Sequence, residues 1–100
     1  MTRLEAWDQL KQLSCSRPNN FNELIANSRS IINCWIEAGL TYPNLYIEEF
    51  VSIDSQADYL RSSTDEREKQ DFYNSFCDIF FIEAHNLSRF LIDNQPNRDD

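Results

Sequence analysis

His85 is the natural starting point for a search for chemistry, because it is the only histidine in the chain. As a general base it would need a nucleophile such as Cys77 within hydrogen-bonding reach. On one helix, the eight positions between Cys77 and His85 correspond to roughly 12 Å along the axis, which is too far. Nothing in the sequence supports pairing with Cys15 or Cys34 instead. We interpret His85 as a surface or half-buried structural residue and predict no catalytic residue and no enzymatic activity.

The carboxylates near His85 do not have the spacing of metal ligands. Metal sites in helical bundles use Glu and His three residues apart, so that both project inward. Glu83 and His85 are only two residues apart and point to different sides of a helix. A phosphate-binding glycine loop is also excluded, because the chain contains a single glycine. We therefore predict no metal site and no cofactor.

Acidic residues outnumber basic residues by 17 to 9, which gives a formal net charge of −8. No Lys or Arg lies between Arg29 and Arg61, and a second base-free stretch runs from Asp71 to Ser88. Direct binding to nucleic acid or to anionic lipid needs clustered bases, so we predict neither. The charge suits a basic protein partner, whose approach an acidic surface would steer. The simpler interpretation is that the negative charge only keeps a small protein in solution.

The first base-free stretch combines tyrosines with carboxylates. Tyrosine is enriched at binding hot spots, and carboxylates pair with the Arg and Lys of a basic partner. We predict a partner-binding surface formed by Tyr42, Tyr46, Glu48, Glu49, Asp54 and Asp58. Two alternatives remain open at this stage. Tyr46 could belong to the core, and the acidic side chains could simply be solvated.

The apolar residues that would position this surface recur every three or four residues, which is helical spacing. They predict helices at about 3–14, 21–38, 44–61 and 65–93. The third is the least distinct, because residues 45–53 also alternate as a strand would. Glu49 interrupts that alternation, so we prefer the helix. Trp7 and Trp35 fall on apolar faces and are predicted to be core residues.

Capping residues support the same helices. In a capping box, a polar residue caps the helix and an acidic residue three positions later reaches back to it. Gly39 follows the last apolar position of the second helix, where a left-handed residue often ends a helix. Pro43 suits the first turn of the third helix. The predicted capping pairs are Thr2 with Glu5, Asn20 with Glu23, and Ser63 with Glu66.

These helices, joined by short loops, predict an all-α fold: a small up-and-down bundle of about four helices with a long C-terminal helix. We expect residues 1–94 to form one domain and residues 95–100 a polar tail. The middle of the long helix is apolar on most sides, which indicates burial between several helices or between two subunits. Phe81 and Ile82 are the predicted self-association residues, and a homodimer would result.

Three widely spaced cysteines without a Cys-x-x-Cys motif fit free thiols in a reducing compartment. The charged N-terminus and the short apolar runs predict neither a secretion signal nor a membrane span, so we expect a cytoplasmic protein. Its predicted function is that of an acidic inhibitor that neutralises a basic nuclease or another nucleic-acid-handling protein by covering its site, as toxin-immunity and anti-defence proteins do. This is an analogy of class and not of sequence motif. The alternative is a helical homo-oligomeric structural or adaptor subunit without catalytic activity.

Overall fold

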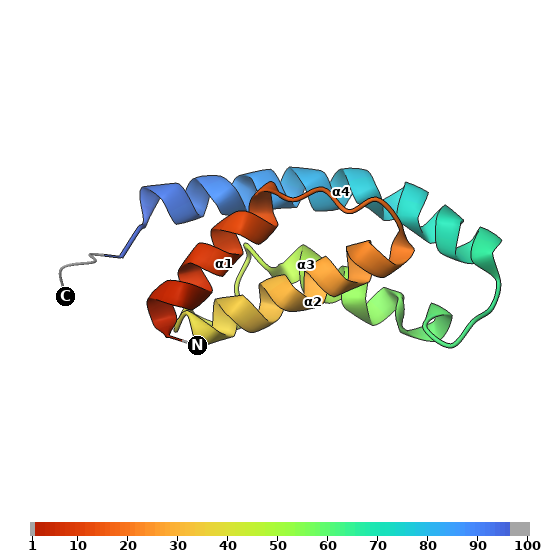
Figure 1. The fold of residues 1–100 in the computed structure, drawn as a ribbon, viewed down its shortest axis with the longest axis horizontal. Coiled ribbons are helices and arrows are strands. Elements are labelled where there is room, and N and C mark those ends of the chain that lie inside the picture. Colours follow the sequence, from red (N-terminus) through yellow and green to blue (C-terminus); the bar gives the residue numbers. More distant parts are fainter. Residues whose placement is uncertain (1, 97–100) are drawn as a thin grey trace.

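In the computed structural model, residues 2–96 are described, and they form four α-helices and one short 3-10 helix without any strand (Figure 1). The all-α prediction is therefore confirmed. Of the predicted polar tail at 95–100, residues 97–100 lie outside the described residues. The elements are α1 (Arg3–Cys15), α2 (Phe21–Glu37), α3 (Glu48–Gln56), the 3-10 helix (Asp58–Leu60) and α4 (Glu66–Asp93).

Successive helices run in opposite directions, so the bundle is up-and-down as predicted (Figure 1). α1 packs on α2 and on α4, α2 packs on α3, and α3 packs on α4. α4 is the longest helix, with 28 residues, and it lies along the other three. The molecule is consequently elongated, with extents of 50 × 21 × 20 Å. Within the part of the chain described, none of the helices has the length and apolar character needed to cross a bilayer.

The first two helices begin at the predicted caps. The Thr2 hydroxyl accepts the Glu5 amide hydrogen at 3.1 Å, and the Glu5 carboxylate accepts the Thr2 amide hydrogen at 3.4 Å, which completes the capping box. The Asn20 side chain accepts the Glu23 amide hydrogen at 2.9 Å. Each bond satisfies an amide that has no partner within the helix.

The predicted cap of α4 at Ser63 is wrong, because the cap is Asp65. Its carboxylate accepts the amide hydrogens of Arg67 and Glu68, at 3.0 and 3.2 Å. A carboxylate there also interacts favourably with the positive end of the helix dipole. The Ser63 hydroxyl instead accepts the Asp65 amide hydrogen at 3.1 Å, and so it orders the residue that caps the helix.

Gly39 ends α2 as predicted, with a φ of 78° in the left-handed region. The Gly39 amide donates to the Ile36 carbonyl at 3.0 Å, and the Leu40 amide donates to the Trp35 carbonyl at 3.3 Å. This pair of bonds is a Schellman motif, which satisfies two carbonyls at the end of the helix. The Leu40 side chain packs against the core, a contact that frequently accompanies this motif.

The third helix is shorter than the predicted 44–61. It starts at Glu48, ends at Gln56, and continues only as the 3-10 helix. Residues 44–47 form a turn instead, in which the Asn44 side chain accepts the Tyr46 amide hydrogen at 2.9 Å. The Asn44 carbonyl accepts the Ile47 amide hydrogen at 3.2 Å. Pro43 therefore precedes the helix, and the strand alternative for 45–53 is excluded by the helix itself.

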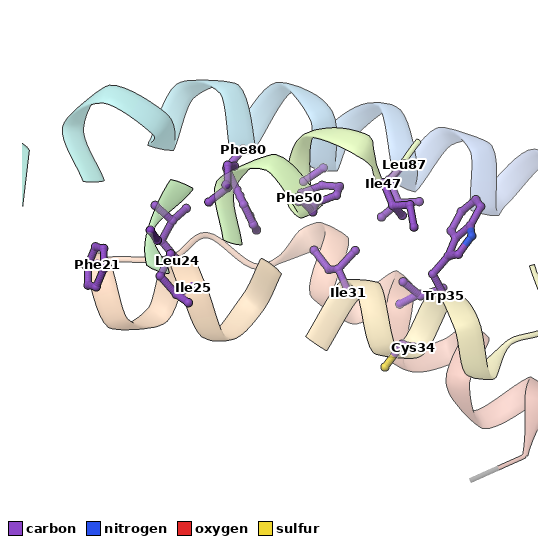
Figure 2. Packing of buried hydrophobic residues seen from close by; sticks show 14 of the residues in the cluster. Phe21, Leu24, Ile25, Ile31, Cys34, Trp35, Ile47, Phe50, Phe80 and Leu87 are labelled. Carbon is purple, nitrogen blue, oxygen red and sulfur yellow. The ribbon is translucent and has the colours of Figure 1, made fainter. Parts of the chain in front are cut away.

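All four helices contribute to the core: Figure 2 shows its side chains between α2 on one side and α3 and α4 on the other, and α1 adds Trp7 and Leu10. Phe50 of α3 meets Phe80 of α4 edge-on, with ring centroids 5.2 Å apart. Trp7 and Trp35 are both buried, as predicted, and the Trp35 indole N–H donates to the Thr41 carbonyl at 2.8 Å. The large side chains in the centre fix how α3 lies against α4, and the candidate site is built across that contact.

Candidate functional site

The connection between α2 and α3 and the first turn of α3 form an apolar surface within the predicted interface. It contains a depression of about 300 Å³. Tyr42 is 50% exposed, and Leu45 is 76% exposed. The lining is Tyr42, Pro43, Asn44, Leu45, Ile47, Glu48 and Val51, so Glu48 is its only charged side chain.

A second depression, of about 480 Å³, lies on the α4 side of Leu45. Its floor includes Tyr46 and Phe90, whose ring centroids are 4.4 Å apart. Leu45 lines both depressions, which makes it the ridge between them. The remaining lining residues come from α4 and the residue that follows it, and they are Glu83, Asn86, Arg89, Asp93 and Asn94.

Tyr46 is shared between the core and this surface. Its ring is half-buried, packs against the core, and lines the second depression. Phe90, which it contacts, also lies 5.6 Å from Trp35 and 6.5 Å from Trp7, measured between ring centroids. The floor of the second depression is thus the outer edge of a packed aromatic cluster. Such a floor offers aromatic surface to a ligand, while most of the other lining side chains are polar.

Glu48 and Glu49 occupy the first turn of α3, where Glu48 is exposed and Glu49 is half-buried. The preceding residue, Ile47, makes no side-chain capping bond. Two carboxylates in that turn therefore stabilise the helix through its dipole. Because successive helical residues point about 100° apart, the two side chains face different directions. Glu48 borders the first depression.

Asp54 and Asp58 form internal ion pairs. The Asp54 carboxylate accepts hydrogen bonds from Arg29 at 2.9 Å and from Arg61. Arg61 also donates to Asp58 at 3.0 Å. The Asp54 side chain is only 25% exposed, whereas that of Asp58 is 74% exposed. These two acids tie α3 to α2 and to the start of the α3–α4 connection, and their charge is compensated within the molecule.

Five of the six predicted interface residues fall into two groups, and the sixth, Glu49, lies half-buried in the first turn of α3 outside both. Tyr42, Tyr46 and Glu48 line the pair of depressions around Leu45. Asp54 and Asp58 belong to the arginine network nearer the end of α3. Of the four predicted interface acids, the two without an arginine partner, Glu48 and Glu49, lie at the start of α3.

Phe81 and Ile82, the predicted self-association residues, are 52% and 57% exposed on the outer side of α4. The guanidinium of Arg17, from the α1–α2 connection, lies 5.1 Å from the centre of the Phe81 ring. That connection is held along α4 by a 2.8 Å hydrogen bond from the Tyr73 hydroxyl to the Pro18 carbonyl. Phe81 is partly covered by this cation, while Ile82 points into solvent.

The residues considered for chemistry do not converge. His85 is exposed and Cys77 is half-buried, and both lie on α4. Cys15, Cys34 and Cys77 are free thiols. Among residues 2–96, no three His, Cys, Asp or Glu side chains are grouped so that they could hold a metal ion.

Leu45 and the α4 half of the second depression were not predicted from the sequence. Glu83 and Asp93 contribute carboxylates there, and Arg89 is the only base in that lining. The sequence did contain one indication of this surface, because Glu83 lies in the second base-free stretch, 71–88. What the sequence could not show is that α3 packs against this part of α4 and joins the two base-free stretches.

Comparison with known proteins adds no family assignment. No protein-family model, no curated protein and no solved structure significantly matches this chain.

Proposed function

We propose that this protein is an acidic inhibitor that binds a basic, nucleic-acid-handling protein and neutralises it by occluding its substrate site. In this proposal it works by binding and not by catalysis. It acts in the cytoplasm, where its three free thiols would stay reduced. The carboxylates around the two depressions would occupy positions that the partner's basic cleft otherwise offers to phosphates.

One observation carries the proposal: the two base-free stretches of the chain lie side by side. The contact between Phe50 and Phe80 joins them, and Phe90, just beyond the second stretch, contacts Tyr46. The surface across α3 and α4 consequently combines carboxylates with exposed apolar side chains and a single arginine, Arg89. Protein interfaces of high affinity combine aromatic anchors with a polar rim in the same way.

The test is capture of the partner at low salt from a lysate of the source cell, followed by elution with a salt gradient and mass spectrometry. A basic nuclease or nucleic-acid-binding protein is expected to elute late. Its activity on nucleic acid should fall as the purified inhibitor is added, with an end point at a fixed molar ratio. Recovery of this chain alone, or a captured protein that stays fully active at saturation, would contradict the proposal.

The second candidate function is self-assembly, which the exposure of Phe81 and Ile82 favours. Exposed apolar side chains on one helix are a common basis for homodimers. Sedimentation at tens of micromolar distinguishes the two functions. A dimer that the double variant Phe81→Ser/Ile82→Ser converts to a monomer would support self-assembly. A monomeric wild-type protein at that concentration would exclude it.

A further inference from the structure

Leu45 is the most exposed of the large apolar side chains in the described part of the molecule, at 76%. It stands between the two depressions, with Tyr42 on one side and the ring of Phe90 on the other. With most of its side chain exposed, Leu45 contributes little to this chain's own core. It separates a mostly apolar depression from one in which the rings of Tyr46 and Phe90 lie among polar side chains. Covering it with another apolar surface would be favourable, because water would be released from all three features.

The charges around these hollows are predominantly negative. Glu48 lies at the first, and Glu83 and Asp93 lie at the second, against the single base Arg89. No ion pair within the described residues joins these three carboxylates to Arg or Lys. A partner that covers Leu45 would therefore gain most by bringing cations to the rim.

We propose that this double depression is a docking site for a basic segment of the partner protein. The segment inserts one large apolar side chain on each side of Leu45 and pairs its Lys or Arg residues with Glu48, Glu83 and Asp93. The inference rests on the proposed function and adds to it the chemistry of the segment that is recognised.

A second copy of this chain fits the site poorly. In a symmetric dimer the same patch meets itself, so that carboxylates would face carboxylates. With three acids and one arginine at the rim, two copies would repel each other. The charge therefore selects a basic occupant and disfavours self-association through this surface.

The test uses a synthetic amphipathic peptide of Leu and Lys as the probe, titrated calorimetrically into the full-length protein at about 0.1 M salt. Leu45→Ser should weaken binding by about tenfold to a hundredfold, since it removes the burial of one leucine side chain. The matched control is Ile36→Ser, which removes an exposed aliphatic side chain from α2 and should leave the affinity unchanged. A peptide of identical composition in scrambled order should bind more weakly than the amphipathic one.

Three results would overturn the inference. The first is an equal effect of Leu45→Ser and Ile36→Ser, and the second is equal binding of the ordered and scrambled peptides. Either would mean that only net charge attracts the peptide. The third is a homodimer that Leu45→Ser dissociates, because a second copy would then cover the site. Both variants change exposed side chains, so thermal melting should show them folded.

Failure here is distinguishable from failure of the proposed function. If a basic protein is captured and neutralised but Leu45→Ser binds it as tightly as wild type, only the docking site is wrong. If no such protein is neutralised but peptide binding still depends on Leu45, the double depression is a docking site and the inhibitory function is wrong.

Discussion

Asp54 shows how a residue can fit an interface pattern and still serve the fold. Its position in a base-free, tyrosine-containing stretch is typical of a binding surface. In three dimensions its carboxylate bonds Arg29 and Arg61, two arginines that bracket that stretch in sequence. No base lies between these two arginines in the sequence, yet both contact Asp54 in the folded chain.

Asp54→Ala should lower the free energy of unfolding by about 1–2 kcal/mol, because it leaves two arginines without their shared acceptor. The Nε of Arg61 is already buried without a partner, which makes that guanidinium sensitive to further loss. Asp58→Ala should cost less than about 0.5 kcal/mol, since its ion pair is largely exposed. Urea denaturation of the two variants measures both values. Equal losses would contradict the structural role assigned to Asp54.

Cys34 gives a prediction about pH. Burial raises the pKa of the Cys34 thiol above its ordinary value, and the nearby charge of Glu37 raises it further. As pH rises through the ordinary thiol pKa of about 8.5, the unfolded chain loses this proton before the folded one does. The stability that the neutral, buried thiol contributes is complete below that pH and is lost above it, until the folded thiol ionises as well.

Comparison with Cys34→Ala isolates this effect, because the cavity that alanine leaves does not depend on pH. The difference in unfolding free energy between wild type and variant should be constant from about pH 6 to 8 and should shrink from about pH 8.5 upward. A difference that stays level or grows would contradict the raised pKa. Chemical denaturation at a series of pH values provides the measurement.

At the scale of elements, the helix ends are decided by hydrogen bonds that short patterns predict only in part. Thr2, Asn20 and Gly39 each act as their spacing predicts. Ser63 fits the same capping pattern as Thr2, but Asp65 lies closer to the first turn of α4 and carries a charge. Two competing caps within three residues cannot be ranked by spacing alone, because the path of the preceding loop selects between them.

Replacing each cap by alanine tests this ranking. Asp65→Ala should lower the free energy of unfolding by about 1 kcal/mol, because two amides at the start of α4 lose their acceptor. Ser63→Ala should cost clearly less, since its hydroxyl bonds only the Asp65 amide. Thermal melting of the two variants compares these losses of stability. A larger loss of stability for Ser63→Ala than for Asp65→Ala would contradict this ranking and identify Ser63 as the cap.

The start of α3 was predicted four residues too early for a related reason. The apolar residues around Tyr46 continue the helical spacing of Phe50 and Ile53, so periodicity extends the helix backwards. The side chain of Asn44 competes by accepting the Tyr46 amide hydrogen, which holds residues 44–47 in a turn. That turn leaves Leu45 exposed, so a local bond decides the shape of the candidate site.

At the scale of the whole molecule, periodicity and capping were sufficient for the all-α fold, the order of the helices and the burial of both tryptophans. They were not sufficient for the surface. Which faces of α3 and α4 meet depends on contacts between distant residues, such as Phe50 with Phe80. Only that packing shows that Glu83 and Asp93 extend the surface begun by Glu48.

We propose that charge on this face steers a basic partner, and the rate of association with that partner depends on such steering. The rate for the captured partner would be measured from about 0.05 to 0.5 M NaCl, where electrostatic steering falls steeply. The double variant Glu48→Lys/Glu49→Lys is compared with Glu66→Lys/Glu68→Lys. Both pairs of acids lie in the first turn of a helix, and both variants change the net charge equally.

We expect the wild-type rate to fall steeply with salt, and Glu48→Lys/Glu49→Lys to lower the low-salt rate by about tenfold or more. The Glu66→Lys/Glu68→Lys control should remain close to wild type, because these residues lie in the first turn of α4, at the opposite end of that helix from Arg89 and Asp93. A rate independent of salt, or equal slowing by the two double variants, would contradict steering by this face.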